Sequence, residues 1–157
     1  MRSLLLVVFL LAAACGQSRP KPAVVSTPDV SPAIRAAVDA KDRSAADRAL
    51  DDGRHPAETL AFFGIAPGMR VAELGAGGGY TTELLARVVG PRGVVYGQNS
   101  PLILSRFAEK PWSERLAKKV DANVVRADRE FDDPLPPDAR DLDAVILILF
   151  YLSLIHI

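Results

Sequence analysis

Apolar residues follow two different periods along the chain from residue 55 onward. In residues 80–89 they fall at Leu84, Leu85, Val88 and Val89, the spacing of an amphipathic helix. Two further helices are predicted, at 56–63 and at 103–119, the second interrupted near Pro111. Short apolar runs bounded by glycine, proline or charged residues predict strands at 69–74, 94–96, 123–126 and 142–150.

Strands and helices in alternation predict a doubly wound, Rossmann-like α/β fold with a parallel sheet and helices on both faces. We expect this domain to occupy residues 54–151. Residues 144–150 are apolar on both faces, as in a central strand of a parallel sheet, although a chain with four strands leaves them at an edge. The pattern therefore predicts a sheet that is truncated after about four strands.

The segment before this domain differs in composition. Residues 16–33 are rich in proline and polar residues, which predicts a flexible tether. Ser31 and Pro32 form a helix start, and the alternation of charged residues with alanine predicts one N-terminal helix over 34–53. A solvated surface helix is the simpler interpretation, and a helix that helps to cover a cofactor is the alternative.

The first 15 residues have the pattern of an export signal. Arg2 precedes an apolar run over 4–14 that is too short to span a bilayer as a helix, and Cys15 follows three alanines. The position of Cys15 resembles the lipobox of bacterial lipoproteins, with Ala12 where that pattern prefers leucine. We expect an exported protein, either periplasmic after ordinary signal cleavage or anchored to the membrane by lipidation of Cys15. An uncleaved anchor or a buried helix is the remaining alternative.

Composition excludes several classes of protein. The 157 residues carry no formal net charge and the pI is about 6.7, so no basic surface for nucleic acid is indicated. A single cysteine cannot form an internal disulfide, and no metal-ligand pattern is present. Trp112 is expected to pack in the core, and His55 to lie in a surface loop.

A glycine-rich loop over 75–79 joins a predicted strand to a predicted helix. Glycines let the backbone turn sharply and let a ligand approach closely, and the following helix presents free amide groups. A dinucleotide fingerprint beginning at Gly75 requires a third glycine where Tyr80 stands, and a P-loop requires a lysine that is absent. The spacing thus disfavours a nicotinamide-dependent oxidoreductase and a P-loop nucleotide hydrolase.

Glu73 followed by Gly75, Gly77 and Gly79 resembles motif I of class I methyltransferases, Glu/Asp-x-Gly-x-Gly-x-Gly. The resemblance implies S-adenosyl-L-methionine (SAM) as cofactor. Gly75, Ala76, Gly77 and Gly79 would belong to the cofactor loop, with Gly75 and Gly77 lining the amino-acid end of SAM. Glu73 would orient its ammonium group. Residues 61–135 more broadly resemble bacterial methyltransferase-like proteins, several of them exported.

Two further positions are candidates for contacts with the adenosine part. Asn99 stands where the family usually places an acidic residue that binds the ribose hydroxyls, and a neutral amide forms weaker hydrogen bonds there. Asp128 follows the third strand and resembles the family's adenine contact. The alternatives are a turn-favouring asparagine and a solvated loop carboxylate.

The resemblance implies a SAM-dependent methyltransferase whose methyl acceptor is unknown. The family sheet has seven strands in the order 3-2-1-4-5-7-6, so this chain is expected to be an N-terminal fragment that is inactive alone, and no catalytic residue can be nominated. Residues 152–157 are interpreted as a foreign tail, with a genuine apolar terminus as the alternative, and His156 receives no role. The competing function is a non-catalytic, exported module that binds a nucleoside or a partner on a degenerate methyltransferase fold.

Overall fold

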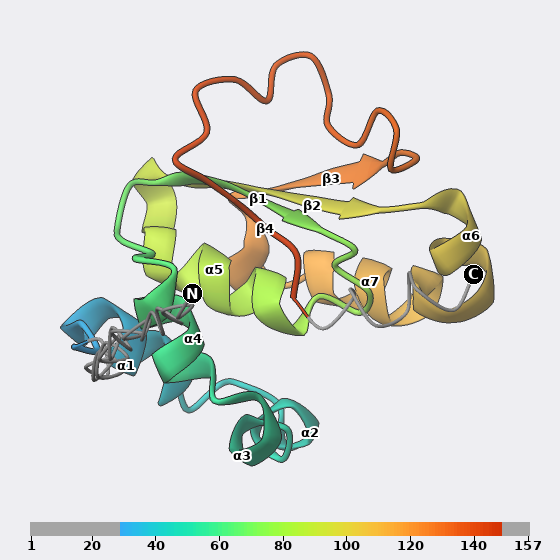
Figure 1. The fold of residues 1–157 in the computed structure, drawn as a ribbon. Coiled ribbons are helices and arrows are strands. Elements are labelled where there is room, and N and C mark those ends of the chain that lie inside the picture. Colours follow the sequence, from blue (N-terminus) through green and yellow to red (C-terminus); the bar gives the residue numbers. More distant parts are fainter. Residues whose placement is uncertain (1–28, 149–157) are drawn as a thin grey trace, which may run out of the picture.

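The computed structural model describes residues 29–148 (Figure 1). Predictions about residues 1–28, Cys15 among them, and about the tail at 152–157 lie outside the described residues. The strands are β1 (Arg70–Leu74), β2 (Val94–Asn99), β3 (Val124–Asp128) and β4 (Ala144–Ile146). The helices are α1 (Pro32–Val38), α2 (Ala45–Arg48), α3 (Asp51–Arg54), α4 (Pro56–Phe62), α5 (Tyr80–Val89), α6 (Pro101–Ile103) and α7 (Glu109–Leu116), with short turns of 3-10 helix at η1 (Gly90–Arg92) and η3 (Lys119–Asp121) and a π-helical turn η2 (Leu104–Ala108).

The four strands form one parallel sheet in the order β3-β2-β1-β4. Val71 of β1 pairs with Val95 of β2 and with Ala144 of β4, which fixes the register of these three strands. The chain turns back across β1 between β3 and β4, as at the switch point of a Rossmann-like sheet. The predicted α/β fold and its 3-2-1-4 strand order are confirmed.

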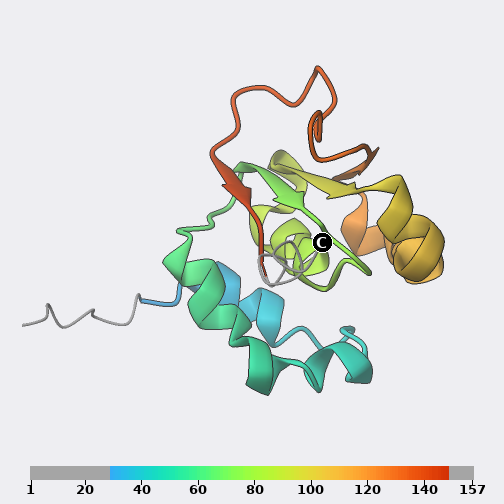
Figure 2. The same ribbon diagram turned by 45° about the vertical axis from the view of Figure 1, so that its right-hand side comes forward.

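The two faces of the sheet are covered differently. Helices α5 and α7 lie on one face, whereas the segment 129–143 crosses the other face as an extended loop (Figures 1 and 2). Within residues 29–148, no helix covers that second face. Helices were predicted on both faces of the sheet, and the described residues place them on one face. Pro134, Pro136 and Pro137 in the crossing segment prevent a regular helix there.

The main core lies between the sheet and α5. Leu84 and Leu85 of α5 pack with Val71 and Val95 of the sheet, and α1 and α4 contribute buried apolar side chains from the far side of α5. A second cluster is centred on Trp112 of α7, which is completely buried as predicted. An added Cβ at Gly97 would lie 2.5 Å from the Trp112 ring, so a glycine in β2 lets α7 pack against the sheet.

The N-terminal segment differs from its prediction. The expected single helix over 34–53 is divided into α1, α2 and α3. Arg43 explains the division, because its guanidinium donates to the carbonyl of Val38 at 2.6 Å and forms a two-bond pair with Asp51. Ser44 then caps α2 by accepting from the backbone amide of Asp47.

Other boundaries shift by a few residues. Strand β2 extends to Asn99, and the described part of the fourth strand is confined to Ala144–Ile146. Pro111 lies in the first turn of α7, as predicted, and His55 is exposed with a left-handed backbone between α3 and α4. None of the helices between residues 29 and 148 has the length and apolar character needed to span a bilayer.

Candidate cofactor site

The glycine loop joins β1 to α5 at the carboxyl end of the sheet. Gly75, Gly77 and Gly79 all have positive φ angles, of 68°, 57° and 78°, which glycine adopts without strain. Their surroundings differ. A Cβ added at Gly77 would meet no atom within 4 Å, whereas one at Gly79 would lie 2.6 Å from the ring of Trp112 and 2.7 Å from the side chain of Arg115. Gly77 therefore faces open space, and Gly79 permits close packing.

A cavity of about 360 Å³ opens in front of this loop, within the size range of small-molecule sites. The cavity brings together four of the predicted site residues, Glu73, Gly75, Ala76 and Gly77. Helices α2 and α3 supply its outer wall. The predicted alternative for the N-terminal segment, a cover over the cofactor, therefore fits the structure better than a solvated surface helix. The remaining lining residues are Asp47, Leu50, Arg54, Gly78, Tyr80, Thr81, Pro111, Arg115 and Ile148.

Glu73 lies in the cavity wall and is almost completely buried. Its carboxylate accepts a short hydrogen bond from the hydroxyl of Thr82, with Thr81 also contributing. Burial raises the pKa of Glu73 to about 7, because these hydroxyl contacts do not replace the lost hydration of the charged form. A cation placed in the cavity would favour the ionised carboxylate.

The end of β2 holds the loop in place. The side-chain carbonyl of Asn99 accepts from the amide of Gly77 at 2.7 Å, and its NH2 group donates to the carbonyl of Gly77 at 3.1 Å. Gln98 accepts from the amide of Gly75 at 2.9 Å. Asn99 is completely buried, and in this structure its amide is bonded to the glycine loop, whereas the sequence predicted it to bind the ribose hydroxyls of the cofactor.

The other predicted site residues lie beside the cavity. Gly79 is the N-cap residue of α5, between the lining residues Gly78 and Tyr80, and Asp128 pairs in register with Asn99 at the end of β3. Asp128 is exposed and forms an ion pair with Arg126 at 2.8 Å. Its position at the carboxyl edge of the sheet agrees with the predicted one, and its carboxylate has an internal partner.

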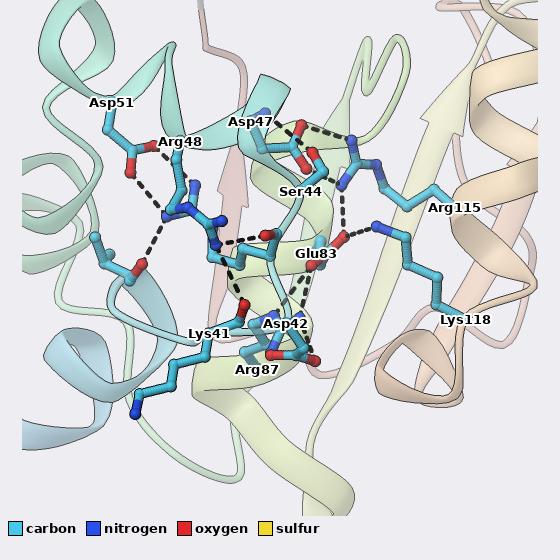
Figure 3. A network of polar contacts seen from close by, with 12 residues as sticks. Lys41, Asp42, Ser44, Asp47, Arg48, Asp51, Glu83, Arg87, Arg115 and Lys118 are labelled. Atoms are coloured by element: carbon cyan, nitrogen blue, oxygen red, sulfur yellow. Dashed lines mark hydrogen bonds and ion pairs between the residues drawn. The ribbon is translucent and has the colours of Figure 1, made fainter.

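A network of ion pairs connects the N-terminal helices to the cavity (Figure 3). Arg115 of α7 donates to the carbonyl of Gly78 at 2.6 Å, to both carboxylate oxygens of Asp47 in α2, and to Glu83 of α5 at 2.5 Å. Lys118 and Arg87 also bond to Glu83. Burial opposes the ionisation of Glu83, but its hydrogen bonds to Lys118 and Arg87 hold its pKa below the usual value. The network fixes α2 against the glycine loop.

Tyr80 occupies the position where a dinucleotide fingerprint would have its third glycine. Its hydroxyl donates to Asp51 of α3 at 2.6 Å, and the guanidinium of Arg54 lies 4.5 Å from the centre of its ring. Burial and the neighbouring Asp51 raise the pKa of Tyr80 to about 12, so the phenol remains protonated at neutral pH. Tyr80 thus joins α3 to the start of α5 at the edge of the cavity.

Sequence patterns did not predict Asp47, Arg54, Tyr80 or Arg115 as site residues. Their contacts join segments up to 68 residues apart, as between Asp47 and Arg115, and no local motif records such a pair. The one available signal was the charge-rich composition of residues 39–54 immediately before the domain. Within residues 29–148, no group of three or more His, Cys, Asp or Glu side chains is arranged to hold a metal ion.

Comparison with known protein families identifies the family to which this chain belongs. A family model described as protein-L-isoaspartate(D-aspartate) O-methyltransferase matches residues 46–128, more than half of the chain. The chain belongs to this O-methyltransferase family. The match begins in α2 and ends with β3, so it includes the cavity cover, the glycine loop and the ends of β2 and β3. Membership confirms the predicted class I methyltransferase and indicates SAM as the cofactor.

Solved structures with similar folds include a protein-L-isoaspartate O-methyltransferase (25% identity, 57% of this chain, 28% of that chain, TM-score 0.43). Others are a SAM-dependent methyltransferase from Aquifex aeolicus (24%, 65% and 54%, 0.48) and a SAM-dependent O-methyltransferase from Thermotoga maritima (26%, 57% and 32%, 0.47). The chain thus spans between 28% and 54% of the length of these three proteins. No curated protein matches the chain.

Proposed function

We propose that this chain is the cofactor-binding part of a SAM-dependent methyltransferase. The observation that carries the proposal is the cavity in front of Gly77, which contains a buried carboxylate, Glu73, without a cationic hydrogen-bond partner among the described residues. SAM supplies a transferable methyl group on a cationic sulfur, and its amino-acid end carries an ammonium group. A buried carboxylate beside a glycine backbone suits both charges.

Residues in the cavity and beside it have separate roles in this proposal. Gly75 and Gly77 allow the cofactor to approach the backbone, and Glu73 binds the ammonium group. Asn99 supports binding by holding Gly77, and Asp128 is the candidate for the adenine amine at the edge of the sheet. Helix α2 excludes water from the cofactor through its connection to Arg115.

Isothermal titration calorimetry of the full chain with SAM, S-adenosylhomocysteine and NAD tests the proposal. We expect binding of the two adenosylated amino acids and none of NAD. Gly77→Val should abolish binding, because it fills the open side of the loop, whereas Lys110→Met should not, because Lys110 is a largely exposed residue of α7 outside the cavity. Binding of NAD without SAM would contradict the proposal. Binding of SAM by the full-length protein without methyl transfer to any acceptor tested would favour the non-catalytic module.

We further propose that the protein is exported and that lipidation of Cys15 anchors it to the membrane. Support comes from the sequence alone, namely the basic Arg2, the apolar run over 4–14 and the small residues before Cys15. Metabolic labelling with a radioactive fatty acid in a bacterial host tests this. Label in the wild type and its absence in Cys15→Ser is the expected result, and an unlabelled wild type released in soluble form would indicate ordinary signal cleavage.

A further inference from the structure

Two arginines, Arg54 and Arg115, line the cavity, and the hydrogen bonds of their guanidinium groups differ. Arg115 uses its guanidinium on the carbonyl of Gly78 and the carboxylates of Asp47 and Glu83. Arg54 is half-buried in the same wall, and within residues 29–148 its guanidinium forms no hydrogen bond or ion pair. Arg115 is therefore part of the framework, whereas the donors of Arg54 are available to a ligand.

The backbone and the ring beneath Arg54 fix its position. Its amide donates to the carbonyl of Leu50 at 3.1 Å, and its carbonyl accepts from the hydroxyl of Thr59 at 3.2 Å. Its guanidinium lies over the ring of Tyr80, which Asp51 holds by a hydrogen bond. A stacked guanidinium keeps its edge donors free while its face is occupied, which is the arrangement arginine uses to bind a carboxylate.

Glu73 and Arg54 line one cavity with opposite charges. Burial raises the pKa of Glu73, and the positive charge of Arg54 opposes part of this rise. Among the described residues, no ion pair joins the two side chains. A ligand that carries an ammonium and a carboxylate on the same carbon atom complements both residues. The amino-acid end of SAM has these two groups.

We propose that Arg54 binds the α-carboxylate of the cofactor's amino-acid end, opposite Glu73. This inference rests on the proposed function, because it assigns one more residue to the same cofactor. It makes Arg54 a determinant of specificity, since a nucleoside without the carboxylate loses that contact. It also gives α3, which precedes the glycine loop by some 20 residues in sequence, a direct part in cofactor binding.

Calorimetry with two ligands that differ by one carboxylate tests the inference. S-adenosylhomocysteine carries the group, and S-adenosyl-3-thiopropylamine is the same molecule without it. In Arg54→Met, the affinity for S-adenosylhomocysteine should fall by about 10- to 100-fold, the effect of one hydrogen bond to a charged group. The affinity for the decarboxylated ligand should stay within about 3-fold of the wild-type value, the scatter allowed for a lost non-essential contact.

Three comparisons separate the outcomes. Arg54→Lys should retain part of the preference for the carboxylate, because it keeps the charge, and Lys110→Met should retain all of it, because it removes an exposed charge elsewhere. Equal weakening of both ligands in Arg54→Met, or weakening of neither, would overturn the inference while leaving the proposed function intact. A wild-type chain that binds neither ligand would overturn the proposed function and the inference with it.

Discussion

Two buried glutamates near the glycine loop have opposite surroundings. Glu83 in α5 is 1% exposed and accepts hydrogen bonds from Arg87, Arg115 and Lys118. Glu73 at the end of β1 is 4% exposed and has hydroxyl partners only. The first carboxylate is surrounded by cations and the second opens onto a cavity. The difference indicates that Glu83 holds the fold together and that Glu73 is available for a cationic ligand.

Removal of Glu83 should give the largest loss of stability. Glu83→Ala removes one of the two carboxylate partners of Arg87 and of Arg115, which keep Asp42 and Asp47, and breaking such largely buried pairs costs up to about 3–5 kcal/mol. Urea unfolding of the full chain at pH 7.5 measures the loss. The matched control is Glu109→Ala, which removes a solvent-exposed partner of Arg126 and should change the unfolding free energy far less. Equal losses in both variants would refute a structural role specific to Glu83.

The glycine loop contains one glycine that faces open space, Gly77, and one that is packed against other side chains, Gly79. Gly77→Ala introduces a side chain into open space at positive φ and should cost about 1–2 kcal/mol. Gly79→Ala has a similar φ and also meets Trp112 and Arg115, which should add about 1–3 kcal/mol for overpacking. Thermal unfolding measures both. In Gly77→Ala the free energy of cofactor binding should change by more than the free energy of unfolding. A larger loss of stability in Gly77→Ala than in Gly79→Ala would contradict the assignment of Gly77 to the open cavity and of Gly79 to a packed position.

The sequence was informative about the loop and the sheet, since both rest on local patterns. Apolar runs located all four strands, and the glycine spacing located the cavity at Glu73, Gly75 and Gly77. Local patterns were insufficient for the N-terminal segment. Its charges alternate as on a solvated helix, yet Arg43 is 3% exposed because it bonds to Val38 and Asp51.

The role of Asn99 illustrates a second limit. Its position at the end of β2 was predicted from the family pattern, and the structure places it there. Which partner an amide takes depends on the distance to the neighbouring loop, and Gly77 lies close enough to occupy both of its polar groups. Residues such as Arg54 and Tyr80 become site residues only when α3 folds back over the start of α5, which no spacing along the chain encodes.

Substitution of Glu73 should give a smaller effect on stability, of opposite sign to that of Glu83. Burial raises the pKa of Glu73 in the folded chain to about 7, so between its usual value and pH 7 the folded state holds a proton that the unfolded state has released. Stability therefore declines as pH rises through this range. Glu73→Gln should remove that decline and gain on the order of 1 kcal/mol at pH 8, while binding of S-adenosylhomocysteine is lost.

Urea unfolding of the wild type and Glu73→Gln at pH 5, 6, 7 and 8 measures this effect. The difference between the two curves isolates Glu73, because other buried groups titrate equally in both proteins. A wild type that gains stability relative to Glu73→Gln as pH rises would mean that Glu73 has a cationic partner in the folded chain. Glu73 would then belong with Glu83 as a structural carboxylate.

The smallest effect is expected at a third buried carboxylate, Asp121 in η3. Asp121 is 2% exposed, and neither of its oxygens has a hydrogen-bond partner among the described residues. Burial and the nearby Glu83 raise its pKa to about 6, so its charge at neutral pH opposes folding. Asp121→Asn should therefore gain about 0.5–1 kcal/mol at pH 7.5, a modest part of the cost of a buried unpaired charge, and little at pH 5, where the protonated acid is already neutral.

Thermal unfolding at the two pH values checks this expectation, and Asp138→Asn, in the crossing segment far from Glu83 in sequence, is the control for removal of one charge. A loss of stability in Asp121→Asn at pH 7.5 would mean that Arg115 and Lys118 stabilise this carboxylate across the intervening distance. Cations without a direct hydrogen bond would then also stabilise a buried carboxylate. The contrast between Glu83 as a structural residue and Glu73 as a ligand-binding residue would then depend only on the cavity beside Glu73.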